Sequence, residues 1–276
     1  MATREQQGLG AFRRAGSAIA ALMFPPACRA CGAETQSDGL CGACFAAAAF
    51  LQGPACPTCG QPEPRLPAHD PAYRCPTCMA DPPALDGLTA VARYEGPVRR
   101  LILALKHGDR LDHVPLLAGW LASVAGARLG AADAIVPVPL HWTRRLKRRF
   151  NQSAEIARTA AHLTGNRGAF APTLLSRQRD TPSQKGRDRA ARRANVAGAF
   201  RAPPGSLVGR RVLLVDDVCT SGATLDAAAR ACRAAGAESV DAAVIALVVL
   251  DRPPYLAQAA GSAPQPDQTP EDDDGR

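Results

Sequence analysis

Four Cys-x-x-Cys pairs constrain the first eighty residues of this chain more than any other feature. Eight of its ten cysteines share this two-residue gap, as Cys28/Cys31, Cys41/Cys44, Cys56/Cys59 and Cys75/Cys78. A Cys-x-x-Cys turn sets two sulfurs on one knuckle, and two knuckles close one tetrahedral zinc site. Disulfide frameworks usually lack such a repeated gap, so the pattern favours two structural zinc sites in a reducing compartment.

The spacing leaves the pairing of the knuckles open. Sequential pairing joins the first two pairs in one site and the last two in the other, whereas an interleaved cross-brace uses the same cysteines in a different order. A redox role is less consistent with four pairs in a row, because redox Cys-x-x-Cys motifs occur singly beside a βαβ unit. A segment of roughly 60 residues with little apolar content needs a metal to fold, so we expect the zinc to be structural.

Beyond the cysteine block, apolar strands alternate with amphipathic helices. We expect strands at 88–94, 134–138, 211–215 and 240–250, and helices from Pro97, over 153–163 and over 223–235. This alternation predicts an α/β fold with a parallel sheet, whose ligands bind beyond the carboxyl ends of the strands. The expected parts are a helical lead over 1–25, a double zinc ribbon over 26–80, an α/β domain over 84–252 and a disordered acidic tail over 257–276.

Charge and hydropathy restrict the partners and the location. The net charge of +8 indicates anionic partners such as phosphates or nucleic acid. Arg13 and Arg14 precede a short apolar run that resembles a secretory signal, but the run ends at Pro25-Pro26 and suits a helix packed on its own protein. No segment approaches the roughly 18 apolar residues that span a membrane, so we expect no transmembrane segment and a cytoplasmic location.

The most informative stretch for function runs from Val212 to Thr224 and reads VLLVDDVCTSGAT. Two adjacent carboxylates at a strand end can accept hydrogen bonds from vicinal ribose hydroxyls. The small residues that follow let backbone N–H groups close on a phosphate at a helix N-terminus. Walker-B strands also end in aspartates, but this chain lacks the G-x-x-x-x-G-K-[ST] loop that accompanies them. The candidate ribosyl-phosphate residues are Asp216, Asp217, Thr220, Ser221, Gly222, Ala223 and Thr224.

This stretch closely matches the 5-phosphoribosyl pyrophosphate (PRPP) motif of type I phosphoribosyltransferases. Joined to the double zinc ribbon, it makes residues 20–252 resemble the ComF family of competence-associated proteins. Further matching marks are Val136-Pro137-Val138-Pro139, the Arg-Phe-Asn-Gln run at 149–152 and the segment 189–200. The family usually has Arg-Gly-Phe-Asn-Gln, whereas this chain has Arg149 at the glycine position.

The resemblance implies a type I phosphoribosyltransferase fold that binds Mg²⁺-PRPP. It places a basic loop against pyrophosphate and a basic hood over the substrate. The hood arginines alternatively track a nucleic-acid backbone, a role that salt-dependent binding would reveal. The loop residues are Arg144, Arg145, Arg148 and Arg149, and the hood residues are Lys185, Arg187, Arg189 and Arg192. Such side chains would stabilise the charge that departs with pyrophosphate.

Two functions follow from the resemblance. The first is a phosphoribosyltransferase whose acceptor no residue pattern identifies, with an implied role in DNA uptake during natural transformation. The second is a PRPP sensor without catalysis that binds single-stranded DNA, or docks on a competence helicase or an uptake-channel protein. An enzyme releases pyrophosphate from PRPP, whereas a sensor binds PRPP and releases none.

Overall fold

The computed structural model describes residues 26–64, 66, 72–107, 110–140, 150–179 and 196–249. Within these ranges the main sheet has four parallel strands in the order β1-β6-β5-β2. The strands are β1 (Gly87–Arg93), β2 (Ala134–Pro137), β5 (Arg211–Cys219) and β6 (Ser239–Leu247). The predicted α/β fold with a parallel sheet is therefore confirmed.

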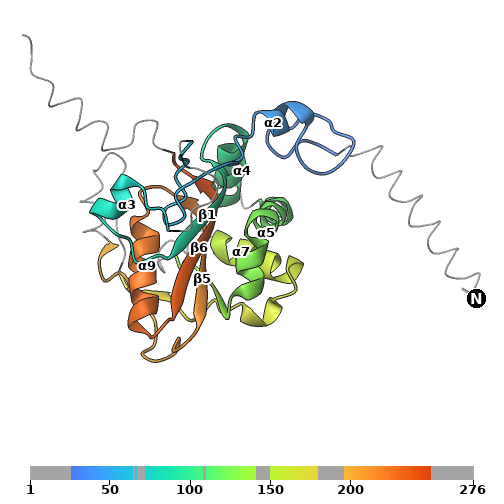
Figure 1. Ribbon diagram of the computed structural model, residues 1–276. Helices are drawn as coiled ribbons and strands as arrows, with labels where there is room; N and C mark the ends of the chain where they lie inside the picture. The colour runs from blue at the N-terminus through green and yellow to red at the C-terminus, as the bar shows by residue number, and fades with distance from the viewer. Residues whose placement is uncertain are drawn as a thin grey trace, which may run out of the picture.

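Helices cover both faces of this sheet (Figure 1). They are α4 (Gly96–His107), α5 (Val114–Ala131), α7 (Gln152–Leu163) and α9 (Ala223–Ala234). Side chains alternate along β5, so they enter two apolar clusters, one on each face of the sheet. Leu213 and Val215 pack in the cluster that includes α4, α5 and α7. Val212 and Leu214 pack in the cluster that includes α9. Burial on both faces explains why the strands are almost continuously apolar.

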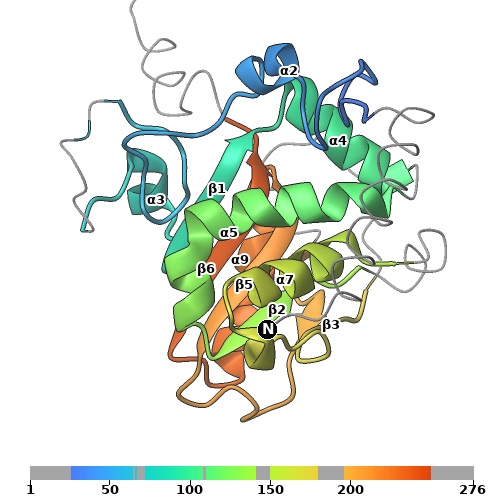
Figure 2. The same ribbon diagram turned by 90° about the vertical axis from the view of Figure 1, so that its right-hand side faces the viewer.

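Helix α5 was not among the predicted elements, and it corrects one expectation. Together with the 3-10 turn η1 (Leu111–His113) it forms a segment, Leu111–Ala131, that is long and apolar enough to cross a membrane by length and composition alone. The expectation that no segment approaches this limit was therefore wrong. The fold gives a reason for the composition, because α5 lies across the sheet (Figure 2). It buries residues such as Leu117, Leu121 and Leu129.

Strand β5 is longer than predicted, and this changes the setting of the acidic pair. It continues to Cys219 instead of ending at residue 215, because its pairing with β6 persists to the register Cys219↔Leu247. Asp216 and Asp217 thus lie within the last part of a hydrogen-bonded strand. Their backbone is fixed by the ladder and not by a turn.

The outer edge of β1 is covered by the segment that joins the two cysteine clusters. Leu51 donates its N–H to the carbonyl of Val91 at 2.9 Å, and Arg93 donates to the carbonyl of Ala49 at 2.8 Å. A covered edge cannot pair with another chain.

The remaining short elements are α2 (Gly42–Ala46), α3 (Pro76–Ala80), η2 (Arg167–Ala169), β3 (Ser176–Arg177) and β4 (Phe200–Arg201).

Candidate functional site

The eight cysteines of the four pairs form two clusters in the structure. Within each cluster the four sulfur atoms lie within 4.8 Å of one another. The first cluster holds Cys28, Cys31, Cys41 and Cys44, and the second holds Cys56, Cys59, Cys75 and Cys78. The pairing is therefore sequential, and the interleaved alternative does not occur.

The donor geometry fits zinc. Sulfurs bound at about 2.3 Å in a tetrahedron stand about 3.8 Å apart. The separations of Cys31–Cys41 at 3.8 Å and Cys59–Cys75 at 3.7 Å match this value. A hydrogen bond with Cys59 lowers the pKa of Cys56, and the same interaction raises the pKa of Cys59. Thiols this close share protons between them, whereas a bound Zn²⁺ holds all four as thiolates.

Neighbouring N–H groups support thiolate charge in both clusters. The backbone N–H of Cys44 points to the sulfur of Cys41 at 3.4 Å, and the backbone N–H of Cys75 points to the sulfur of Cys56 at 3.5 Å. The guanidinium of Arg100 on α4 lies 3.7 Å from the sulfur of Cys44. Outer interactions of this kind orient metal ligands and stabilise their charge.

The second cluster docks directly on the sheet. Leu88 of β1 donates its N–H to the carbonyl of Pro57 at 3.0 Å, and the Gln61 side chain donates to the carbonyl of Val248 at 3.0 Å. Gly60 has a φ of 70°, in the left-handed region, and a Cβ at this position would lie 2.5 Å from Leu88 Cδ2. Only glycine combines this backbone conformation with so close an approach.

The acidic pair has a separate partner for each carboxylate. Asp216 accepts the hydroxyl hydrogen of Ser153 at 2.8 Å and the backbone N–H of Asp217 at 2.9 Å. Asp217 is paired with Lys106 of α4, with Nζ 2.8 Å from Oδ1. The strand end therefore brings together side chains from β5, α4 and α7.

The loop after the pair leads into the N-terminus of α9. Its turn depends on Gly222, which has a φ of 79° in the left-handed region and occupies the N-cap position. Among the described residues no side chain caps α9. The first N–H groups of the helix are then available to an anion, where the helix dipole favours negative charge.

The Asn-Gln end of the 149–152 run begins α7 beside Asp216. Asn151 caps the helix by accepting the Ser153 N–H at 3.1 Å, and its amide donates to the carbonyl of Val138 at 3.1 Å. Gln152 is 1% exposed, and its Nε2 has no hydrogen-bond partner within the described part of the chain. Buried amide nitrogens usually have a hydrogen-bond partner, so Gln152 is an exception within the described ranges.

The charge on Asp216 depends on pH near neutrality. Burial, followed by the negative charge of Asp217, raises the pKa of Asp216 to about 7. Ser153 and Lys106 act in the opposite direction. A carboxyl whose charge changes in this range, at a strand end and beside a helix N-terminus, is typical of functional sites.

Sequence reasoning missed two members of this site, Lys106 and Ser153. Both lie far from the acidic pair along the chain, and no local pattern distinguishes them from other polar residues of amphipathic helices.

The predicted basic loop lies outside the described residues, and its members are Arg144, Arg145, Arg148 and Arg149. Also outside them lie the predicted hood residues Lys185, Arg187, Arg189 and Arg192, the helical lead 1–25 and the tail 257–276.

Comparison with known proteins agrees with these features. The family model described as "Double zinc ribbon domain" matches residues 19–79, and the model described as "Phosphoribosyl transferase domain" matches residues 134–259. The DNA utilization protein YhgH of Salmonella typhi is 35% identical over 193 residues, which cover 68% of this chain and 81% of its own length. YhgH of Escherichia coli K12 is 32% identical over 192 residues, with the same coverage of both chains. Competence protein F of Haemophilus influenzae is 29% identical over 213 residues, or 74% of this chain and 88% of its own length.

The fold and the clusters thus define a protein with a double zinc ribbon followed by a phosphoribosyltransferase domain. The two Cys₄ clusters are the zinc-binding sites of that ribbon. The chain belongs to the ComF family, as the extent of its similarity to YhgH and Competence protein F establishes. The resemblance inferred from the sequence is confirmed.

Proposed function

We propose that this chain binds Mg²⁺-PRPP at the end of β5 and acts in DNA utilization. The observation that carries the proposal is the acidic pair followed by the uncapped N-terminus of α9. The ribose hydroxyls would donate to Asp216 and Asp217, and the 5′-phosphate would accept N–H groups of the 220–224 loop. A bound Mg²⁺ would neutralise part of the pyrophosphate charge. The proposal includes the predicted roles of the 144–149 loop, which would face pyrophosphate, and of the hood, which would cover the substrate.

The role in DNA utilization comes from the names of the relatives, which are called DNA utilization protein and Competence protein F. We propose a cytoplasmic location, because two Cys₄ sites need reduced thiols.

Whether the site catalyses transfer depends on the fate of the C1–O bond of PRPP. In a transferase this bond breaks with its electron pair leaving on pyrophosphate, and the acceptor forms the new bond at C1.

Calorimetric titration of Mg²⁺-PRPP into the zinc-loaded protein tests the ribosyl-phosphate site. In Asp216→Asn/Asp217→Asn we expect the affinity to fall by about 100-fold or more, because charged acceptors hold hydroxyls more strongly than neutral amides. Asp133→Asn is the matched control, since Asp133 is an exposed carboxylate paired with Arg211 away from the site. Absence of binding by the intact protein would overturn the proposal. Pyrophosphate release then separates a transferase from a sensor.

The affinity for Mg²⁺-PRPP should also depend on pH. The folded pKa of Asp216 is raised to about 7, so the carboxyl is protonated below that pH and ionised above it. The ionised carboxylate accepts hydrogen bonds from ligand hydroxyls more strongly than the neutral acid does. We expect the association constant to rise by up to about tenfold per pH unit from about pH 5.5 to 7 and to level off near pH 8. Asp216→Asn corrects for ionisation of the ligand, and identical profiles for both proteins would contradict the assignment.

A further inference from the structure

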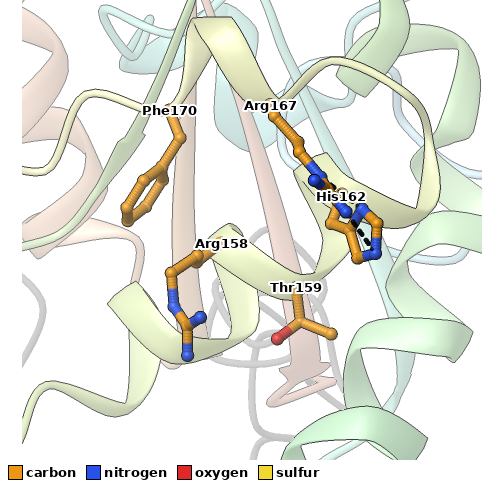
Figure 3. Close-up of a pocket in the computed structure, with 5 residues that line it drawn as sticks. All are labelled: Arg158, Thr159, His162, Arg167 and Phe170. Atoms are coloured by element: carbon orange, nitrogen blue, oxygen red, sulfur yellow. Dashed lines mark hydrogen bonds between the residues drawn. The ribbon is translucent and has the colours of Figure 1, made fainter.

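A pocket lies on the outer side of α7, away from the acidic pair. Its volume is about 400 Å³, and Figure 3 shows the side chains around it. Three of them come from one face of α7, and the other two come from η2 and the residue that follows it. The lining residues are Arg158, Thr159, His162, Arg167 and Phe170.

The polar groups of this pocket suit an anion. Two guanidiniums, an imidazole and a hydroxyl line it, and no carboxylate is among its described lining residues. The nearest acidic partner is Glu155, which accepts from Arg158 at 2.5 Å as an i,i+3 pair on the surface. Pairs exposed to water in this way contribute little, so a phosphate can compete for Arg158.

Arg167 and His162 lie against each other in this pocket. Arg167 Nε lies 2.5 Å from His162 Nδ1, and Arg167 Nη2 lies 2.7 Å from His162 Nε2. A neutral imidazole offers one acceptor nitrogen and a guanidinium offers none, so at most one of these two approaches is a hydrogen bond. Both side chains keep N–H groups that can donate to an anion in the pocket.

Phe170 adds an aromatic surface to the same pocket. Its ring is half-buried, and the backbone is fixed by hydrogen bonds from Phe170 N–H to the carbonyl of Arg167 at 3.2 Å and from Ala171 N–H to the carbonyl of Ile135 at 2.9 Å. An aromatic ring beside a group of cations is the usual arrangement for holding one nucleotide of a single strand, with the base stacked and the phosphate paired.

We propose that this pocket holds a nucleotide of single-stranded DNA. The choice of a strand over a free nucleotide rests on the proposed function in DNA utilization. The pocket is distinct from the ribosyl-phosphate site, although α7 contributes to both. Ser153 contacts Asp216, whereas Arg158 and His162 lie about 8 and 14 Å further along the helix at about 1.5 Å per residue. We therefore expect DNA and PRPP to bind independently.

Fluorescence anisotropy of labelled (dT)₂₀ with the full zinc-loaded chain, at salt concentrations from about 50 to 200 mM, tests this proposal. Arg158→Ala/Arg167→Ala should weaken binding at least about tenfold and reduce the slope of log K against log salt by about 0.7 for each phosphate that is no longer neutralised. Phe170→Ala should weaken binding about tenfold and leave that slope unchanged, because stacking releases no counterions.

The control is Arg230→Ala. Arg230 is 62% exposed on α9 and paired with Asp226, as Arg158 is 63% exposed on α7 and paired with Glu155. If this control and the pocket variants weaken binding equally, the effect comes from general positive charge and the proposal is overturned. Unchanged DNA binding in the pocket variants would overturn it as well. Absence of (dT)₂₀ binding by the intact protein would also overturn it. Asp216→Asn/Asp217→Asn should keep DNA affinity, and the pocket variants should keep PRPP affinity, so the two proposals fail separately.

Discussion

Replacing Cys56 by serine is expected to remove one of the two zinc ions and to unfold the second ribbon. Cys56 is 1% exposed and belongs to the second sulfur cluster. The described apolar cluster around it contains little beyond the cysteines themselves and Tyr73. Folding of such small modules depends on the metal, which contributes about 10 kcal/mol or more in comparable peptides.

Zinc content per chain, measured by mass spectrometry after dialysis, checks this result. It should fall from two to one, and amide exchange should increase over residues 54–64 and around Cys75 and Cys78. The matched control is Cys232→Ala, which changes a fully buried cysteine of α9 outside both clusters. This control should keep two zinc ions and lose only the part of the folding free energy that comes from packing of the Cys232 side chain. Retention of both ions by Cys56→Ser would contradict the ligand assignment.

Replacing Lys106 by methionine is expected to destabilise the phosphoribosyltransferase domain by about 3 kcal/mol at about pH 8. The side chains of Lys106 and Asp217 are 18% and 10% exposed, so the pair is largely removed from water. Without Lys106, the carboxylate of Asp217 stays buried without its cation and next to Asp216. Removal of one partner of a buried pair is costly for this reason, while removal of both costs much less.

Urea unfolding of a double-mutant cycle measures this effect. Asp217→Asn in the Lys106→Met background should restore most of the free energy of unfolding, since no uncompensated charge remains at that position. Arg211→Met provides the comparison, because its pair with Asp133 is 54% and 41% exposed and should contribute less than about 1 kcal/mol. Equal destabilisation by Lys106→Met and Arg211→Met would show that the Lys106 pair is not a buried one.

Helix α4 connects the first zinc cluster with the acidic pair. Arg100 lies 3.7 Å from a sulfur of the first zinc cluster, and Lys106 reaches Asp217 from the same helix. Arg29 of the first ribbon also pairs with Asp112, just before α5. The ribbon is thus in direct contact with the elements that hold the acidic pair.

Features that depend on neighbours along the chain could be predicted from the residues alone. The two-residue gaps between cysteines define the zinc ligands, because each knuckle is a local turn. The alternation of apolar strands and amphipathic helices determines a parallel sheet. The run from Val212 to Thr224 encodes an acidic strand end and a helix start within one short stretch, which is enough to locate the candidate site.

Features that depend on distant segments required the three-dimensional fold. The strand order β1-β6-β5-β2 and the extension of β5 to Cys219 follow from pairing with β6, which no local pattern reports. The sequential zinc pairing was settled in the same way, since both pairings use identical residues. Lys106 became a member of the site only because α4 packs beside the end of β5, and a lysine on an amphipathic helix resembles any other solvated charge until its partner is known.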